Sequence, residues 1–375
     1  MSAAGKLRDE LRPHGRIAPG CKTCLYLADC GGFEPEPTLF NSDCVQANCC
    51  RSHLTGSTAH LPPCDNVCPN NPVYLQQLIE VGGLSFSDIP GIAQAPVELP
   101  RYIPLTYRRY VQKVSVNWPM VAISTYEVVK VTNGHMKTVA GCPKSLRATF
   151  GLSPESCVLL RGVADDRPLE RYWTYRRIDQ IPRQLAALDV TMAVGPNFSH
   201  FLDVPRHDNL FNRKRQLLCL REFVDAGLNT VPHLNATQPG DWRFWGRFLA
   251  KNPSIRVVAI EFETGNRSRS EGERVVRELV QLQQSIGRSL HPLAIGGTQY
   301  IERIAEEFAA GSFVDSTPFM KTVKRQSFAG RMGRKAVWRH SPTLPGESLD
   351  KLLQHNLHRY SELLDQRWTS RRKSS

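Results

Sequence analysis

Eight of the eleven cysteines crowd between Cys21 and Cys68, and their spacing could bind metal. Cys21-x2-Cys24 and Cys64-x3-Cys68 are spaced like metal half-sites, because a short turn brings both sulfurs to one side. Cys30 precedes two glycines, which allow a sharp turn. We expect ligands to be drawn from this set: Cys21, Cys24, Cys30, Cys44, Cys49, Cys50, Cys64 and Cys68.

Zinc is the expected metal, and an iron–sulfur cluster is the alternative. Cys68-Pro69 resembles ferredoxin-type ligation, but the regular CxxCxxC run is absent. His53 and His60 could replace thiolate ligands. The N-terminus lacks the apolar stretch of a signal peptide, so a reducing, cytoplasmic setting is expected and disulfides are not. Such a site typically stabilises a small module with little core of its own.

Polar residues and glycines recur where apolar runs of the chain end. Buried polar groups are costly without partners, so their repeated appearance at strand ends predicts a ring of groups around one pocket. Taken singly, each could serve only as a helix cap or a turn residue. Glu263 and Thr264 come shortly after Glu261, one of these candidates. The candidate residues are Asp165, Asp166, Asn197, Ser199, His233, Asn235, Glu261, Gly296, Gly297 and Asp315.

The stretch PNFSHFLDVPRHDNLFNRKRQ is the most unusual in composition. Arg206, Lys214 and Arg215 in this stretch could contact phosphate or sugar beside the pocket. The alternative is a solvated loop whose charges pair with one another.

Alternating strand and helix patterns begin near Tyr102. The apolar runs PMVAIS, SCVLLRGV, VTMAVGPNFS, NTVPHLNA, IRVVAIEFET, HPLAIGG and SFVDSTPF are separated mostly by helical patterns, and YIPLTY could supply an eighth strand. Near-continuous Val, Ile and Leu indicates strands buried on both faces. The series predicts an α/β fold, a TIM-like (β/α) barrel, with an open doubly wound sheet as the alternative. In such a barrel the chemistry lies at the carboxyl ends of the strands.

The 375 residues allow more than one domain. We expect a Cys-rich metal-binding module at 1–72, a linker with one helix at 73–104, the barrel at 105–330, and a basic C-terminal extension with a helix at 331–375. No apolar run approaches the ~20 residues that span a bilayer. No GxGxxG or Walker A loop supports a nucleotide cofactor.

The formal charge of +13 favours a polyanionic partner, most often nucleic acid. Residues 319–340 contain seven basic residues and no acidic one, and Arg371, Arg372 and Lys373 form a basic tail. Lys321, Lys324 and Arg325 are the candidate phosphate contacts in this segment.

The run HPLAIGGTQYIERIAEEFAAGSFVDSTPFMKTVKRQ resembles the C-terminal part of tRNA-guanine transglycosylases and of their DNA-directed 7-deazaguanine relatives. The resemblance covers mainly residues 155–330. It implies that Asp315 is the nucleophile, that Asp165 or Asp166 is the second essential aspartate, and that Lys321, Lys324 and Arg325 bind phosphate.

Two features of that family are missing: its Asp-Ser-Gly-Gly-Phe-Gln motif and its C-terminal zinc site. The pattern PNFS…D-x-PR…N-x-KR also resembles uncharacterised proteins of phages and mobile elements, which implies no reaction.

The resemblance and the charge together predict guanine exchange on DNA or tRNA through an Asp315 nucleophile. Asp165 or Asp166 would move protons, while Asn197, His233 and Glu261 would read the base. The alternative is a non-catalytic nucleic-acid-binding protein whose N-terminal module is stabilised by metal. An iron–sulfur redox or radical enzyme is the third possibility, although the radical CxxxCxxC spacing is absent.

Overall fold

The computed structural model describes residues 66–67, 71, 73–89, 91–108, 115–201, 204, 206–263, 268–344 and 346–372. The chain forms two compact units, which are treated one at a time. Unit 1 comprises Met1–Pro90, Phe198–Leu218 and Asn235–Lys251, and unit 2 comprises Gly91–Asn197, Cys219–Leu234 and Asn252–Ser375. The eight N-terminal cysteines lie outside the described residues.

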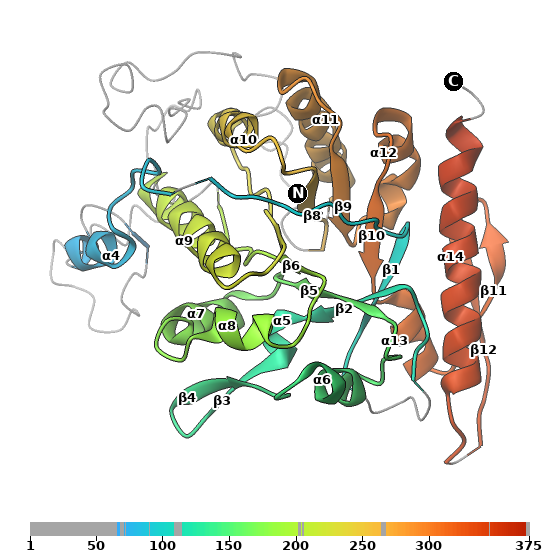
Figure 1. Ribbon diagram of the computed structural model, residues 1–375. Helices are drawn as coiled ribbons and strands as arrows, with labels where there is room; N and C mark the ends of the chain where they lie inside the picture. Colours follow the sequence, from blue (N-terminus) through green and yellow to red (C-terminus); the bar gives the residue numbers. More distant parts are fainter. Residues whose placement is uncertain are drawn as a thin grey trace, which may run out of the picture. The chain divides into compact units, whose positions relative to one another are not determined.

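Unit 2 is built on an almost closed barrel of eight parallel strands (Figure 1). The spatial order is β7-β6-β5-β2-β1-β10-β9-β8, which follows the chain order once the last strand pairs with the first. The strands are β1 (Tyr102–Thr106), β2 (Met120–Ser124), β5 (Cys157–Arg161), β6 (Met192–Val194), β7 (Thr230–Val231), β8 (Val257–Glu261), β9 (His291–Ile295) and β10 (Ser312–Asp315).

Two seams close the sheet on itself. Strand β10 pairs with β1 in parallel, with Pro104 opposite Asp315. Between β7 and β8 the contact is a single bridge at His233 and Ala259, where the Ala259 N–H donates to the Pro232 carbonyl at 2.9 Å. The predicted barrel is therefore confirmed, including YIPLTY as a strand, and the open-sheet alternative is wrong.

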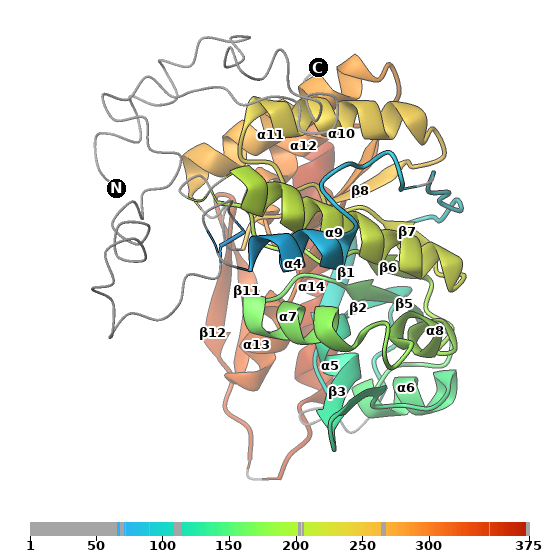
Figure 2. The same ribbon diagram turned by 90° about the vertical axis from the view of Figure 1, so that its left-hand side faces the viewer.

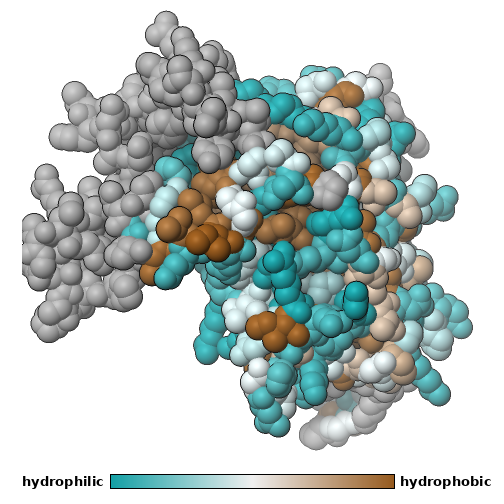
Figure 3. Space-filling model, turned by 60° about the vertical axis from the view of Figure 1, so that its left-hand side comes forward, coloured by the Kyte–Doolittle hydropathy of each residue, from teal (hydrophilic) through white to brown (hydrophobic). Residues whose placement is uncertain are grey.

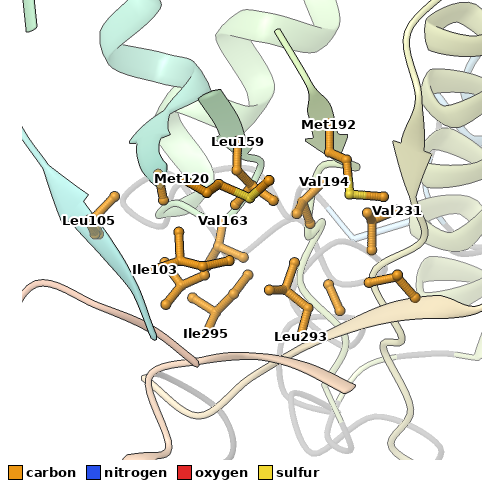
Figure 4. Packing of buried hydrophobic residues seen from close by; sticks show 14 residues of the cluster. Ile103, Leu105, Met120, Leu159, Val163, Met192, Val194, Val231, Leu293 and Ile295 are labelled. Carbon is orange, nitrogen blue, oxygen red and sulfur yellow. The ribbon is translucent and has the colours of Figure 1, made fainter. Parts of the chain in front are cut away.

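The barrel interior is filled by aliphatic side chains that point toward one another from successive strands (Figure 4). Ile103, Leu159, Val194 and Ile295 are among its fully buried members. Strands buried on both faces must be apolar throughout, which is why the sequence runs did not alternate. The interior is a packed core, so chemistry is confined to the ends of the strands.

Helices and a small hairpin connect the strands of unit 2. The connection from β2 to β5 holds α5 (Thr125–Val128), the hairpin of β3 (Val129–Thr132) and β4 (His135–Thr138), and α6 (Pro143–Phe150). The remaining helices of the series are α7 (Asp166–Tyr175), α8 (Ile181–Ala186), α11 (Arg269–Ser285), η2 (Thr298–Tyr300), α12 (Ile301–Glu307) and α13 (Thr317–Val323).

The connection from β5 to β6 contains two helices. The stretch from LERYW to RQLAAL forms α7 and α8, because Gln180 takes a left-handed conformation and Pro182 follows at the start of α8.

The chain after α13 contains a hairpin in addition to the helix expected within 331–375. It consists of β11 (Gln326–Met332), β12 (Lys335–His340) and the long helix α14 (Asp350–Arg372). Both ribbon views place the hairpin beside α14 (Figures 1 and 2). Asn356 of α14 accepts from the Phe328 N–H at 2.8 Å and donates to the Gln326 carbonyl at 2.8 Å. Arg367 binds both carboxylate oxygens of Glu302 on α12, at 2.7 and 2.8 Å.

The described part of unit 1 contains α4 (Tyr74–Val81), α10 (Pro239–Lys251) and the start of α9 (Arg206–Asp225), which continues into unit 2. Asp241 is fully buried and binds Arg206 and Arg213, each at 2.5 Å. Burial opposes its ionisation, but the two arginines hold the pKa of Asp241 well below its ordinary value. This charged cluster is part of the unit's interior.

On the face shown in Figure 3 hydrophilic residues predominate, and apolar residues gather in one larger patch near the middle of the view and in smaller patches elsewhere. Within the described ranges, no helix combines the length and apolar character needed to cross a bilayer.

Candidate active site

The carboxyl ends of the barrel strands form what is here called the mouth of the barrel. Four charged residues lie there and are called the mouth cluster: Arg161, Glu261, Glu263 and Asp315. Asp315 ends β10, Glu261 ends β8, and Arg161 ends β5. Because parallel strands end on one rim, these residues share one end of the barrel.

Two hydrogen bonds orient the Asp315 carboxylate, and a third binds its backbone carbonyl. Its Oδ2 accepts from the Tyr360 hydroxyl of α14 at 2.7 Å, and its Oδ1 accepts from the Thr317 N–H at 2.6 Å. The Tyr102 hydroxyl donates to the Asp315 carbonyl at 3.2 Å. Burial, and then the charge of Asp315, raise the pKa of both tyrosines well above its ordinary value. Both phenols therefore stay protonated as hydrogen-bond donors.

Arg161 and Glu263 form an ion pair across the mouth. The two residues come from the third and sixth barrel strands along the chain, which are three positions apart around the barrel. Their side chains are 13% and 33% exposed. Burial raises the pKa of Glu263; Arg161 opposes this, while Glu261 and Asp315 add to it. The mouth cluster therefore holds three carboxyl groups, of which Glu263 is paired with Arg161, Glu261 accepts from the Glu263 N–H, and Asp315 accepts from Tyr360 of α14.

The glycine pair after β9 lies against this carboxylate. Gly296 and Gly297 both have positive φ, 71° and 69°. A Cβ on Gly296 would come within 2.9 Å of the Glu263 Cγ, and one on Gly297 within 2.4 Å of the Phe262 ring. Both positions therefore require glycine, and Gly296 confines the Glu263 side chain.

The other predicted strand-end residues of unit 2 are not part of the mouth cluster. The Asn197 Oδ1 accepts from the Ala164 N–H at 3.0 Å and ties two strand-end loops together. His233 is 1% exposed, at the seam between β7 and β8. Asp165 and Asp166 are exposed at the start of α7, where the helix dipole stabilises a negative charge.

Five predicted residues belong to unit 1. The Ser199 carbonyl accepts from Asn212 at 2.8 Å, and Asn235 donates to the Phe198 carbonyl at 2.7 Å. Arg206 pairs with Asp241.

Lys214 and Arg215, the remaining two, are 0% and 6% exposed. The Lys214 ammonium binds the Asp88 carboxylate and the Ser85 carbonyl. Arg215 binds the Asn212 side chain at 2.6 Å and lies over the Phe198 ring. Both side chains belong to the interior, where they have no surface to offer a phosphate.

The basic segment 319–340 is split between α13 and the hairpin. Lys321 is half-buried, with its Nζ 5.7 Å from the centre of the Trp338 ring, whereas Lys324 and Arg325 are exposed. The exposed cations on the hairpin are Arg331, Arg334, Lys335 and Arg339.

A pocket of about 530 Å³ opens at the end of β1. Its described lining consists of Tyr107, Arg108, Glu127 and Met320. Met320 belongs to α13, which begins two residues after Asp315. The pocket therefore lies between the end of β1 and α13, the helix that follows Asp315 in the chain.

Sequence reasoning did not single out Arg161 or Tyr360. Arg161 carried a usable signal, a charge ending the apolar run CVLL. Tyr360 carried none, because it is one apolar-face residue of a helix 45 positions from Asp315.

Among the described residues, no group of three or more His, Cys, Asp or Glu side chains is arranged to hold a metal ion. The cysteines predicted as ligands fall outside those residues.

A comparison with models of known protein families finds no match, and a comparison with curated proteins finds no related sequence.

Proposed function

We propose that the protein exchanges a guanine base in a nucleic acid, with Asp315 as the nucleophile. The supporting observation is the setting of Asp315: a carboxylate at the carboxyl end of a barrel strand, oriented by Tyr360 and the Thr317 N–H. A second carboxyl group, Glu263, stands in the same mouth. Two carboxyl groups in unlike environments suit glycosyl transfer, since one can attack while the other carries a proton.

In the first step an Asp315 oxygen attacks C1′ of the target nucleoside, and the bond from C1′ to N9 of guanine breaks. The base leaves with the bonding electron pair and takes up one proton, while the sugar stays esterified to Asp315. In the second step N9 of an incoming base attacks C1′, its proton is removed, and Asp315 is released as a carboxylate. The resemblance assigns the proton transfers to Asp165 or Asp166.

The basic residues support a nucleic acid as the substrate. A base buried in a duplex cannot reach a barrel mouth, so the target is unstacked or single-stranded. Lys324, Arg325 and the hairpin cations would hold the neighbouring phosphates. Along the chain, Asp315 is followed by α13, then by Lys324 and Arg325, and then by the hairpin. The pocket between the end of β1 and α13 would give room for the nucleic-acid strand.

The N-terminal cysteines are proposed to bind metal as a structural module. Zinc is the first choice and an iron–sulfur cluster the second, in a cytoplasmic setting where thiols stay reduced. The chemistry proposed for Asp315 does not pass through this metal.

The test is incorporation of labelled guanine into single-stranded DNA, duplex DNA and tRNA by the wild type and by Asp315→Asn. The substitution is nearly isosteric, so the fold should persist while exchange falls to background. Asp189→Asn is the matched control, because Asp189 is exposed and has a positive φ that asparagine also adopts. Exchange retained by Asp315→Asn would exclude Asp315 as the nucleophile.

A wild type that exchanges no base on any nucleic acid would favour the second candidate, a non-catalytic nucleic-acid-binding protein. The exposed basic hairpin alone supports that candidate. It predicts salt-dependent binding without any covalent intermediate.

A further inference from the structure

The backbone and side chain of Glu263 are fixed by their surroundings. Its N–H donates to the Glu261 carboxylate at 2.8 Å, two residues back along the chain. Gly296 lies so close that a methyl group there would overlap the Glu263 Cγ. Glu263 therefore has less freedom to move than a carboxylate on an open surface.

Arg161 reaches Glu263 from β5, three strands away around the barrel. Because this guanidinium is mostly buried, it holds the partly exposed carboxyl group toward the mouth. The charged groups around Glu263 come from three strands: Arg161 from β5, Glu261 from β8 and Asp315 from β10.

These surroundings favour the protonated form of Glu263. Burial contributes most to raising its pKa, Arg161 opposes the rise, and the charges of Glu261 and Asp315 increase it. Glu263 therefore keeps its proton at a higher pH than an ordinary glutamate. Part of that effect depends on the charge of Asp315.

We propose that Glu263 is the acid–base group of the base exchange, with Arg161 as its positioning residue. Glu263 gives its proton to a nitrogen of the departing purine while the bond between C1′ and N9 breaks and the bond between Asp315 and C1′ forms. The Glu263 carboxylate then takes the N9 proton of the incoming base as N9 attacks C1′ and Asp315 leaves. This inference rests on the proposed function and replaces Asp165 and Asp166, which are exposed, as the proton carriers.

The charge of Asp315 couples the two steps. When Asp315 becomes an ester its negative charge is lost, so the repulsion that favoured the proton on Glu263 disappears and the proton is released to the leaving base. When Asp315 is set free its charge returns, and Glu263 again attracts a proton, now from the incoming base. The acid is therefore strongest when a donor is needed and weakest when an acceptor is needed.

The test compares two leaving bases in one oligonucleotide series. Guanine needs a proton to leave, whereas 7-methylguanine carries a positive charge in the nucleoside and leaves as a neutral base without one. Glu263→Gln should slow guanine release about 100-fold or more and leave 7-methylguanine release within a few-fold of wild type. Asp315→Asn should abolish both.

The matched control is Glu222→Gln, which removes another half-buried glutamate paired with arginine, at Arg176 and Arg177. It should leave the release of both bases unchanged. A Glu263→Gln variant that releases guanine normally, or loses both bases equally, would overturn the acid–base role while Asp315 chemistry stands. A wild type that releases neither base overturns the proposed function and this inference together.

Arg161→Met adds a readout that a merely structural role would not move. Guanine release requires protonated Glu263, so its rate falls as pH rises through the pKa of that group. Removing Arg161 takes away the charge that lowers this pKa, and the alkaline limb should move to higher pH. An alkaline limb that stays in place, or moves to lower pH, contradicts the assignment.

Discussion

His291 begins β9, at the amino-terminal end of the barrel strands and away from Asp315. The Ser312 hydroxyl donates to the Pro100 carbonyl at 2.7 Å, so the His291 Nε2 must donate to the Ser312 Oγ at 2.9 Å. Burial, with a smaller effect of Arg101, lowers the pKa of His291 to about 4. The ring is therefore a neutral donor whose role is stability rather than catalysis.

This histidine predicts an acid-sensitive barrel. Its folded pKa lies below the unfolded value of 6.5, so the unfolded chain binds the extra proton as pH falls from about 6.5 to 4. The free energy of unfolding should drop by about 3 kcal/mol over this range. Denaturant titrations at a series of pH values measure it. His291→Gln, which can still donate to Ser312, should lose that component of the slope; an unchanged slope would contradict the prediction.

At the scale of elements, α14 connects the β11–β12 hairpin, where phosphate binding is proposed, to Asp315, the proposed nucleophile. Asn356 of α14 fixes the hairpin, and Tyr360, one turn further on, orients Asp315. The Trp338 ring of the hairpin lies 6.2 Å from the Tyr360 ring. The same helix thus supports both parts of the proposed site.

Lys324→Ala with Arg325→Ala should weaken nucleic-acid binding and reduce its salt dependence. Each lost phosphate contact lowers the slope of log affinity against log salt by about 1, so the double variant should lose about 2. Fluorescence anisotropy over a salt series is the measurement. Lys130→Ala with Lys137→Ala is the control. These exposed lysines lie opposite each other in the register of the other hairpin, β3–β4. Equal slopes in the first variant and the wild type would place the footprint elsewhere.

At the scale of the whole molecule, metal binding and barrel folding are expected to be separable. Cys21→Ser with Cys24→Ser should release bound metal while the barrel keeps its far-UV circular dichroism, because the barrel has a large aliphatic core of its own. Elemental analysis identifies zinc or iron, and a visible absorption band would indicate an iron–sulfur cluster. Cys142→Ser with Cys157→Ser is the control, as both thiols are exposed. Full metal occupancy in the first variant would exclude these ligands.

The sequence by itself determined the barrel and its strands. All eight runs became strands because each is a short, continuous apolar stretch that is stable only when buried on both faces. It also indicated that Asp315, Glu261 and the glycine pair lie at the carboxyl ends of strands, since each stands at or directly after the end of an apolar run. These are local signals, and local signals can be read along the chain.

Tertiary structure alone decided which of these groups meet. Arg161 and Glu263 are about 100 positions apart, and only closure of the barrel brings them across one mouth. Tyr360 reaches Asp315 because α14 packs against the barrel, a contact with no sequence signature. Lys214 and Arg215 carry the same charge as Lys324 and Arg325, yet the first pair is buried and the second exposed. Composition records a residue's charge, but its surroundings in the fold determine whether that charge faces solvent, a partner or a substrate.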